Sequence, residues 1–348
     1  MKSLIFLTAL SIVGSCANKS NKEKIQDIKD GIVVAAPDKA LQYGKTITAD
    51  ELELHVTVFS SARFEGRAVG TKGQKLAAEY LEQFYILENI ATPIGGEDYF
   101  QEVPSSYLSD AYNDSENVIA FIEGSEKPDE VIVISGHYDH EGISPTGEIF
   151  HGADDNGSGT AVMLEIAQAF KSASENGHGP KRSIAFLHFT AEEIGLYGSK
   201  YYTDNPIFPL ENTVACLNMD MIGRVDAKHQ RENNENYLYL IGSNRLSTEL
   251  HYLSEAVNAY SVNLDLDYKY NDPNDRNKYY YRSDHFNFAR YNVPVIFYFS
   301  GEHEDYHKPT DTADKLNYPV LEKRAQLIFG TAWQLANQDK RIESDKAQ

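Results

Sequence analysis

Apolar and polar positions alternate along most of the chain in a way that predicts alternating strands and helices. Continuous or β-branched apolar runs are typical of strands buried on both faces, and they cover residues 118–122, 131–135, 183–189, 213–218, 237–241 and 293–298. Apolar side chains recur at helical spacing over 73–87, 158–173 and 321–337. Strands that alternate with helices predict an α/β sandwich with a largely parallel sheet.

The first segment has the pattern of an export signal. Lys2 precedes an apolar run over 3–13, which at about eleven residues is too short to span a bilayer and is typical of a signal-peptide core. The run ends in Val13-Gly14-Ser15-Cys16, which resembles the bacterial lipobox. We expect residues 1–15 to be a lipoprotein signal peptide, and lipid on Cys16 to anchor the exported protein to a bacterial cell membrane, on its periplasmic or cell-surface side. An ordinary cleaved signal with an incidental cysteine is the alternative.

The rest of the chain is predicted to hold one domain. Residues 16–43 are polar, with lysines at the start, and are expected to form a tether. Because no break in composition follows, residues 44–338 are expected to form a single domain and 339–348 a C-terminal tail. Cys216 would then have no intramolecular partner, so no disulfide is expected.

Composition excludes several classes of protein. The chain has 348 residues, enough for a substantial core, and its 52 acidic and 32 basic side chains give a formal charge of −20. Nucleic acid is therefore not expected as a partner, because phosphate binding needs a basic surface. Two cysteines exclude a disulfide scaffold and a cysteine-rich metal site. The 11 histidines and the many carboxylates remain as candidate ligands.

Histidines and carboxylates gather where the predicted strands end. Ligands of open α/β sheets bind outside the carboxyl ends of strands, and the motifs at such places are His137-Tyr138-Asp139, Gly152-Ala153-Asp154-Asp155-Asn156-Gly157-Ser158-Gly159, Ala191-Glu192-Glu193, Asn218-Met219-Asp220 and Tyr306-His307. A lone histidine or aspartate at a strand end is usually a hydrogen-bonded turn residue. The whole set in order points instead to a shared site.

The residue types suit a zinc centre. Zinc takes nitrogen and oxygen ligands, whereas calcium prefers six to eight oxygens. One shared aspartate can hold two ions about 3.5–4 Å apart. Asp139 projects to the same side as His137 and could accept its other ring N–H. Glu192 and Glu193 are adjacent, so their side chains diverge, and one could bind metal while the other takes a proton from water.

Together these motifs resemble the co-catalytic, two-zinc aminopeptidase family of secreted bacterial and vacuolar metallopeptidases. The resemblance runs from about residue 61, with Arg63-Phe64-Glu65-Gly66-Arg67, to about residue 317. It implies the zinc-dependent exopeptidase fold, a three-layer α/β/α sandwich with a mixed, mostly parallel sheet. It also implies two Zn²⁺ per chain.

The resemblance implies a role for each motif residue. His137, Asp155 and Asp220 would bind the first zinc, and Asp155, Glu193 and His307 the second. Asp155 is the bridge rather than Asp154, because the family's bridging residue stands three positions before the serine at 158. In some members of the family the peptide bond after the bridging aspartate is cis, so the resemblance implies a cis bond between Asp155 and Asn156.

Four further residues complete the implied site. Glu192 matches the general base and acid, and Asp139 the carboxylate that orients a ligating histidine. Tyr306 matches a tyrosine that hydrogen-bonds the tetrahedral intermediate, with a packed aromatic as the alternative. Arg282 matches an arginine that binds the substrate or product carboxylate, with a surface ion pair as the alternative. The remaining nearby histidines are expected to be core or loop residues: His140, His151, His188, His285 and His303.

The implied reaction is hydrolysis of the N-terminal peptide bond of peptides with a free N-terminus, through a hydroxide that bridges two zinc ions. A glutaminyl cyclase-like acyltransferase with one zinc is an alternative, although the Asp-Asp-Asn-Gly-Ser-Gly stretch that differs in that relative is intact here. A carboxypeptidase or dipeptidase, and a non-catalytic peptidase-fold binding ectodomain, also stay open. The tyrosines between 268 and 281 either line a specificity pocket or pack against one another. The oligomeric state is not predicted.

Overall fold

The computed structural model describes residues 19–96, 98–109 and 111–346. The predicted signal peptide and Cys16 lie outside these residues. Among the helices that are described, none combines the length and the apolar character needed to cross a bilayer. Cys216 is a buried free thiol.

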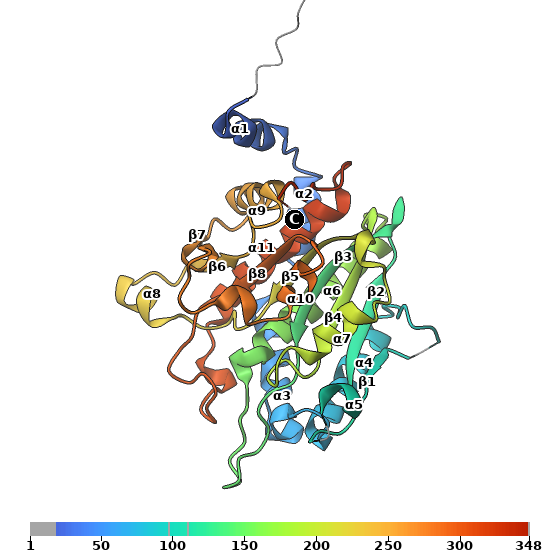
Figure 1. Ribbon diagram of the computed structural model, residues 1–348, viewed down its shortest axis with the longest axis vertical. Coiled ribbons are helices and arrows are strands. Elements are labelled where there is room, and N and C mark those ends of the chain that lie inside the picture. The colour runs from blue at the N-terminus through green and yellow to red at the C-terminus, as the bar shows by residue number, and fades with distance from the viewer. Residues whose placement is uncertain (1–18, 97, 110, 347–348) are drawn as a thin grey trace, which may run out of the picture.

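One mixed sheet forms the centre of the described chain (Figure 1). Its strands are β1 (Phe100–Val103), β2 (Ser115–Ile122), β3 (Lys127–His137), β4 (Arg182–Phe189), β5 (Thr213–Met219), β6 (Tyr237–Ile241), β7 (Asp265–Asp267) and β8 (Val295–Phe299), in the order β1-β2-β4-β3-β5-β8-β6-β7. The pairs β3/β4, β3/β5, β5/β8 and β6/β7 are parallel. The pairs β1/β2, β2/β4 and β6/β8 are antiparallel. The predicted mixed, mostly parallel sheet is confirmed.

Helices cover both faces of this sheet. They are α1 (Asn21–Gly31), α2 (Pro37–Gly44), α3 (Ala49–Phe59), α4 (Lys72–Leu87), α5 (Ser105–Leu108), α6 (Gly159–Glu175), α7 (Tyr197–Asp204), α8 (Ala227–Glu232), α9 (Thr248–Tyr260), α10 (His285–Ala289) and α11 (Tyr318–Asn337). One apolar cluster joins one sheet face to α2, α3, α4, α6, α9 and α11. A second cluster joins the other face to α7 and α10. The predicted three-layer sandwich is therefore confirmed.

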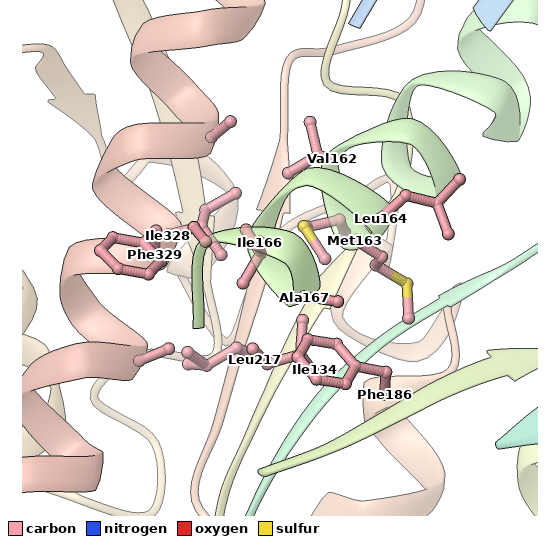
Figure 2. Packing of buried hydrophobic residues seen from close by; sticks show 14 of the residues in the cluster. Ile134, Val162, Met163, Leu164, Ile166, Ala167, Phe186, Leu217, Ile328 and Phe329 are labelled. Atoms are coloured by element: carbon pink, nitrogen blue, oxygen red, sulfur yellow. The ribbon is translucent and has the colours of Figure 1, made fainter. Parts of the chain in front are cut away.

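Alternation along the strands explains why the central runs are continuously apolar. In β3, Ile132 and Ile134 belong to the first cluster, whereas Val131 and Val133 belong to the second. Figure 2 shows α6 seated on the first face, with its Ile166 near Ile134, Leu217 and Phe186 of the strands and near Ile328 and Phe329 of α11. Full burial of such a side chain contributes about 1.5–3 kcal/mol.

Both segments outside the predicted domain make contacts with it. The predicted tether over 16–43 is helical in much of its described part. Its α1 has no buried residue and lies away from the sheet (Figure 1), whereas α2 packs onto α11, where the Tyr43 ring stacks on Trp333 at 5.9 Å. The predicted tail also packs, because Ile342 is buried and Asp345 Oδ1 accepts the Thr248 N–H at 2.7 Å. Both segments are held by single apolar side chains, such as Tyr43 and Ile342. These are spaced too widely in the sequence to form a continuous apolar pattern.

Candidate metal centre

The predicted site residues come from loops at a single edge of the sheet. Because β3, β4, β5 and β8 all run parallel, the segments after their carboxyl ends meet there. His137 is the last residue of β3, Glu193 follows β4, Asp220 follows β5, and His307 lies in the long segment after β8. Asp155 belongs to a wide turn, η2 (Ala153–Ser158), that leads into α6.

Asp155 lies at the middle of this group. Its Oδ1 is 3.3 Å from His137 Nε2, and its Oδ2 is 3.2 Å from His307 Nε2. His137 Nε2 is also 3.4 Å from Asp220 Oδ1, and His307 Nε2 is 3.2 Å from Glu193 Oε2. Each oxygen of Asp155 therefore faces its own histidine–carboxylate pair, which is the arrangement of a carboxylate shared by two cations.

The donor set fits a bound cation. His137 is 1% exposed, and its Nε2 is buried with no hydrogen-bond partner in the described residues. Burial opposes the charged form of His307, but the carboxylates of Asp155 and Glu193 outweigh it and raise the pKa of His307 to about 10. An acidic pocket that pulls protons onto imidazoles releases them when a metal ion takes their place. Imidazole nitrogens and carboxylate oxygens are ligands that zinc accepts.

Asp139 supports this group in two ways. Its Oδ1 lies 3.6 Å from His137 Nδ1, so it faces the ring nitrogen that points away from Asp155. Its two oxygens also accept the backbone N–H groups of Glu192, at 3.1 Å, and Glu193, at 3.4 Å. Asp139 therefore holds the Glu192–Glu193 turn, which its position in the sequence did not predict.

The two residues that follow Asp139 in the sequence contact Glu193 and His307. The Nδ1 of His140 is 2.7 Å from Glu193 Oε1, and Glu141 Oε1 is 3.2 Å from His307 Nδ1. The sequence placed His140 among core and loop histidines and did not single out Glu141. Their proximity to His137 in the chain was a signal, but only the path of the loop after β3 decides which groups they contact.

Asp154 connects three of the ligand-bearing segments. Its Oδ1 accepts the Gly223 N–H at 2.6 Å, and its Oδ2 is 3.2 Å from His303 Nε2. Asp311 Oδ2 accepts the N–H groups of Asp154, at 2.9 Å, and Asp155, at 3.2 Å. These contacts join the Asp155 turn to the segments after β5 and β8. Neither Asp154 nor His303 had a role in the sequence-based prediction.

The Asp155–Asn156 peptide bond is cis, as the resemblance implied. The Asn156 side chain donates to the Met219 carbonyl at 2.9 Å and accepts the N–H of Gly159 at 3.0 Å. The turn is therefore tied both to β5 and to the first residue of α6.

Glu192 lies beside the first pair of candidate ligands. One of its carboxylate oxygens lies within 4.8 Å of ligand atoms of both His137 and Asp220. Burial raises the pKa of Glu192 well above its usual range; His137 opposes this, whereas the carboxylates of Asp220 and Glu193 add to it. Such a carboxyl group is suited to take up a proton and return it.

Tyr306 and Arg282 line the cleft that contains the candidate ligands Asp155, Glu193 and Asp220. Arg282 Nη2 donates to the Tyr306 hydroxyl at 3.3 Å, and Arg282 Nη1 is 3.0 Å from Glu302 Oε1. Burial, with the charge of Asp155, raises the pKa of Tyr306, so its phenol stays protonated and can donate. The cleft is lined by Asp155, Glu192, Glu193, Asp220, Met221, Tyr279, Arg282, Phe297, Phe299, Glu302 and Tyr306. All the predicted site residues therefore lie in or beside one cleft.

The other nearby histidines pack away from this cleft. His188 Nε2 is 2.7 Å from the Tyr85 hydroxyl, and the His285 ring stacks on Phe297 at 4.8 Å. Tyr279 lines the cleft and also packs on Tyr270, with ring centroids 4.6 Å apart. The packing interpretation is therefore confirmed for Tyr279, and a role in a specificity pocket stays a prediction.

Comparisons with known proteins identify relatives of this chain. The sequence profile of Peptidase family M28 matches residues 117–332. Aminopeptidase YwaD of Bacillus subtilis (strain 168) is 26% identical over 242 residues, which are 67% of this chain and 48% of that protein. The probable glutamate carboxypeptidase LAMP1 of Arabidopsis thaliana is 39% identical over 106 residues, which are 30% of this chain and 14% of that protein.

Solved structures share the fold. The chain superimposes on the LapA aminopeptidase of Legionella pneumophila with a TM-score of 0.68 and 20% sequence identity, covering 89% of this chain and 77% of that one. The chain spans about half the length of YwaD.

Proposed function

The chain belongs to peptidase family M28, and on that premise we propose that it is a zinc-dependent aminopeptidase. It removes the N-terminal residue from peptides with a free N-terminus. The observation that carries this proposal is Asp155, whose two oxygens face separate histidine–carboxylate pairs. His137, Asp155 and Asp220 would hold one zinc ion, and Asp155, Glu193 and His307 would hold the second.

When bound, the two zinc ions would polarise the scissile carbonyl and lower the pKa of a water molecule. Glu192 accepts a proton from that water on a carboxylate oxygen as the water oxygen adds to the scissile carbonyl carbon. As the C–N bond breaks, Glu192 passes the proton to the nitrogen of the leaving amine. The Tyr306 hydroxyl donates a hydrogen bond to the developing oxyanion. Arg282, whose guanidinium lies beside that hydroxyl, binds a carboxylate of the substrate or product.

Support for a free amino terminus comes from the relatives. Both YwaD of Bacillus subtilis and LapA of Legionella pneumophila are named as aminopeptidases.

The test combines metal content and hydrolysis on one sample. Near two zinc ions per chain, chelator-sensitive release from amino-acid p-nitroanilides and no release from the N-acetylated substrate would support the proposal. One zinc ion and no release would favour the glutaminyl cyclase reaction instead. Two zinc ions with cleavage of the blocked substrate would refute the N-terminal specificity. Two zinc ions with no cleavage of any peptide would point to a binding ectodomain.

Substitution of Glu192 tests whether this residue acts as the general base rather than as a metal ligand. Glu192→Gln is expected to keep both zinc ions and to lose nearly all turnover, about 10²–10⁴-fold for a general base. Glu304→Gln, at an exposed glutamate in the segment after β8, is the matched control. Near-normal turnover in Glu192→Gln would remove this residue from the reaction.

We also propose that lipid on Cys16 anchors the exported protein to the cell membrane. The support is the apolar run over 3–13 followed by the lipobox-like Val13-Gly14-Ser15-Cys16. Cys16→Ser is expected to move the protein from the membrane fraction to the soluble fraction of fractionated cells. Unchanged membrane association in this variant would refute the anchor.

A further inference from the structure

A second, larger hollow shares the turn η5 (Tyr279–Tyr281) with the catalytic cleft. Side chains from the β6–α9 connection, η5, α10 and the C-terminal segment line it. We name it the arginine groove and define it by Arg245, Tyr280, Tyr281, Phe286, Arg290 and Lys346. None of these residues takes part in the proposed metal centre.

The groove is basic in a strongly acidic protein. The chain carries a formal charge of −20, yet three cations, Arg245, Arg290 and Lys346, line the groove against one carboxylate, Asp272. Within the described residues these cations form no ion pair. Each donates to a neutral oxygen instead: Arg245 to the Asp272 carbonyl, Arg290 to the amide oxygen of Asn287, and Lys346 to the carbonyl of Asn244. Charge complementarity therefore favours an anionic occupant.

Arg245 is held ready for such an occupant. Its guanidinium carbon lies 3.8 Å from the centre of the Tyr280 ring, and its Nε is buried without a hydrogen-bond partner among the residues that the structure describes. Stacking on an aromatic ring fixes the plane of a guanidinium, whose paired N–H groups match a carboxylate. Tyr281 is 45% exposed and packs against Phe286, with ring centroids 4.9 Å apart. The groove thus offers three cations together with aromatic side chains, which suits an acidic peptide segment.

The groove and the cleft are joined through η5. Tyr279 and Arg282 line the cleft, whereas Tyr280 and Tyr281, between them in the chain, line the groove. The two hollows therefore share one turn. The proposal below requires a peptide with its N-terminus at the metal centre to reach the groove past Arg282 and Tyr281.

We propose that the arginine groove is an exosite that binds carboxylates of the peptide substrate several residues downstream of the scissile bond. This inference rests on the proposed aminopeptidase function and adds a substrate class to it, namely extended peptides with acidic side chains beyond the first few residues. Substrates too short to reach the groove gain nothing from it.

The test compares kcat/KM for Leu-Gly-Gly-Gly-Glu-Glu-Glu-amide, the same peptide with glutamine in place of glutamate, and leucine p-nitroanilide. The wild-type protein is expected to favour the acidic peptide by about tenfold, the size of one charge-assisted hydrogen bond. Arg245→Gln combined with Arg290→Gln is expected to abolish that preference and leave the p-nitroanilide unchanged. Arg231→Gln, at an exposed arginine on α8, is the matched control and is expected to keep the preference.

Equal rates for the two peptides in the wild-type protein, or a preference that survives in the double variant, would overturn the exosite. If no substrate is hydrolysed, the proposed function fails. Binding of the labelled acidic heptapeptide to the metal-free protein, measured by fluorescence anisotropy, then tests the groove independently of hydrolysis. Binding that is lost in the double variant supports the groove. Equal binding of the glutamate and glutamine peptides overturns it.

Discussion

Arg67 is expected to control how firmly the metal-site loops are held. It is fully buried at the end of the turn η1 (Ala62–Arg67), and its guanidinium donates to four backbone carbonyls. These belong to Phe59, at 3.1 Å, and to Tyr138, His151 and Gly152, each at 2.8 Å. Three of the four carbonyls lie in the segments that carry His137 and Asp155. Burial lowers the pKa of Arg67 to about 10, against the opposing effect of Asp155, so the group stays charged at neutral pH.

The substitution Arg67→Lys keeps the positive charge but replaces the planar guanidinium group, with its several N–H donors on separate nitrogens, by an ammonium group. An ammonium group offers its donors from one nitrogen, so we expect about two of the carbonyls to lose their partner. Each buried group left without a partner costs about 1–3 kcal/mol, which gives a loss of about 4 kcal/mol. For a chain of 348 residues the entropy of unfolding is about 0.7 kcal/mol/K. The expected fall in Tm is therefore about 5 °C.

The assay is calorimetry of the metal-free protein, followed by a zinc titration of the folded variant. Arg63→Lys is the matched control, because Arg63 is exposed on the same turn. The zinc titration is expected to show weaker binding for Arg67→Lys, since its carbonyl partners flank His137 and Asp155. If the two variants melt within one degree of each other, the inference that the guanidinium group holds these loops is refuted.

Three further predictions address the centre and its surroundings. Asp155→Ala is expected to lose both zinc ions together in equilibrium dialysis with metal analysis, and a full metal complement would contradict a bridging role. Asp154→Asn keeps the acceptor for the Gly223 N–H but removes the charge that faces His303. Zinc affinity, measured by competition with a chelating dye, is therefore expected to fall about 10–100-fold. Unchanged affinity would show that Asp154 does not position the centre. Burial lowers the pKa of His188 to about 3. Between that pH and about 6.5, the unfolded state binds more protons than the folded state. The stability contributed by His188 therefore falls as pH falls through this window, by up to about 1.4 kcal/mol per pH unit. Urea unfolding of the metal-free protein at pH 7 and pH 5 is expected to show a smaller acid-induced loss for His188→Gln, and identical losses would disprove this assignment.

The strands that the sequence predicted are the ones buried on both faces. A strand such as β3 must be apolar at every position to pack against α6 on one side and against the α7–α10 layer on the other. The short edge strands β1 and β7 were not predicted, because residues 100–103 and 265–267 are largely part-exposed and mix polar with apolar side chains. The helix predicted from residue 158 begins at Gly159, after a wide turn that apolar spacing cannot indicate.

The packing of both terminal segments also required the structure. Residues 16–43 are polar enough to predict a tether, yet Ala40 and Tyr43 of α2 are buried. A few apolar side chains are enough to dock a short helix when a large surface such as α11 is already formed. Their number is too small to produce a periodic pattern in the sequence.

The sequence by itself determined the alternating α/β architecture and the motifs that meet at the strand ends, whereas the roles of these residues, and the choice of Arg282, were implied by the resemblance to a family. It could do so because buried strands must be apolar and because parallel strands bring their carboxyl ends to one edge. The contacts of His140, Glu141, Asp154 and Arg245 were decided by tertiary structure alone. Each of these side chains meets its partner through the path of a loop, and loop paths depend on packing between segments far apart in the chain, which no local pattern encodes.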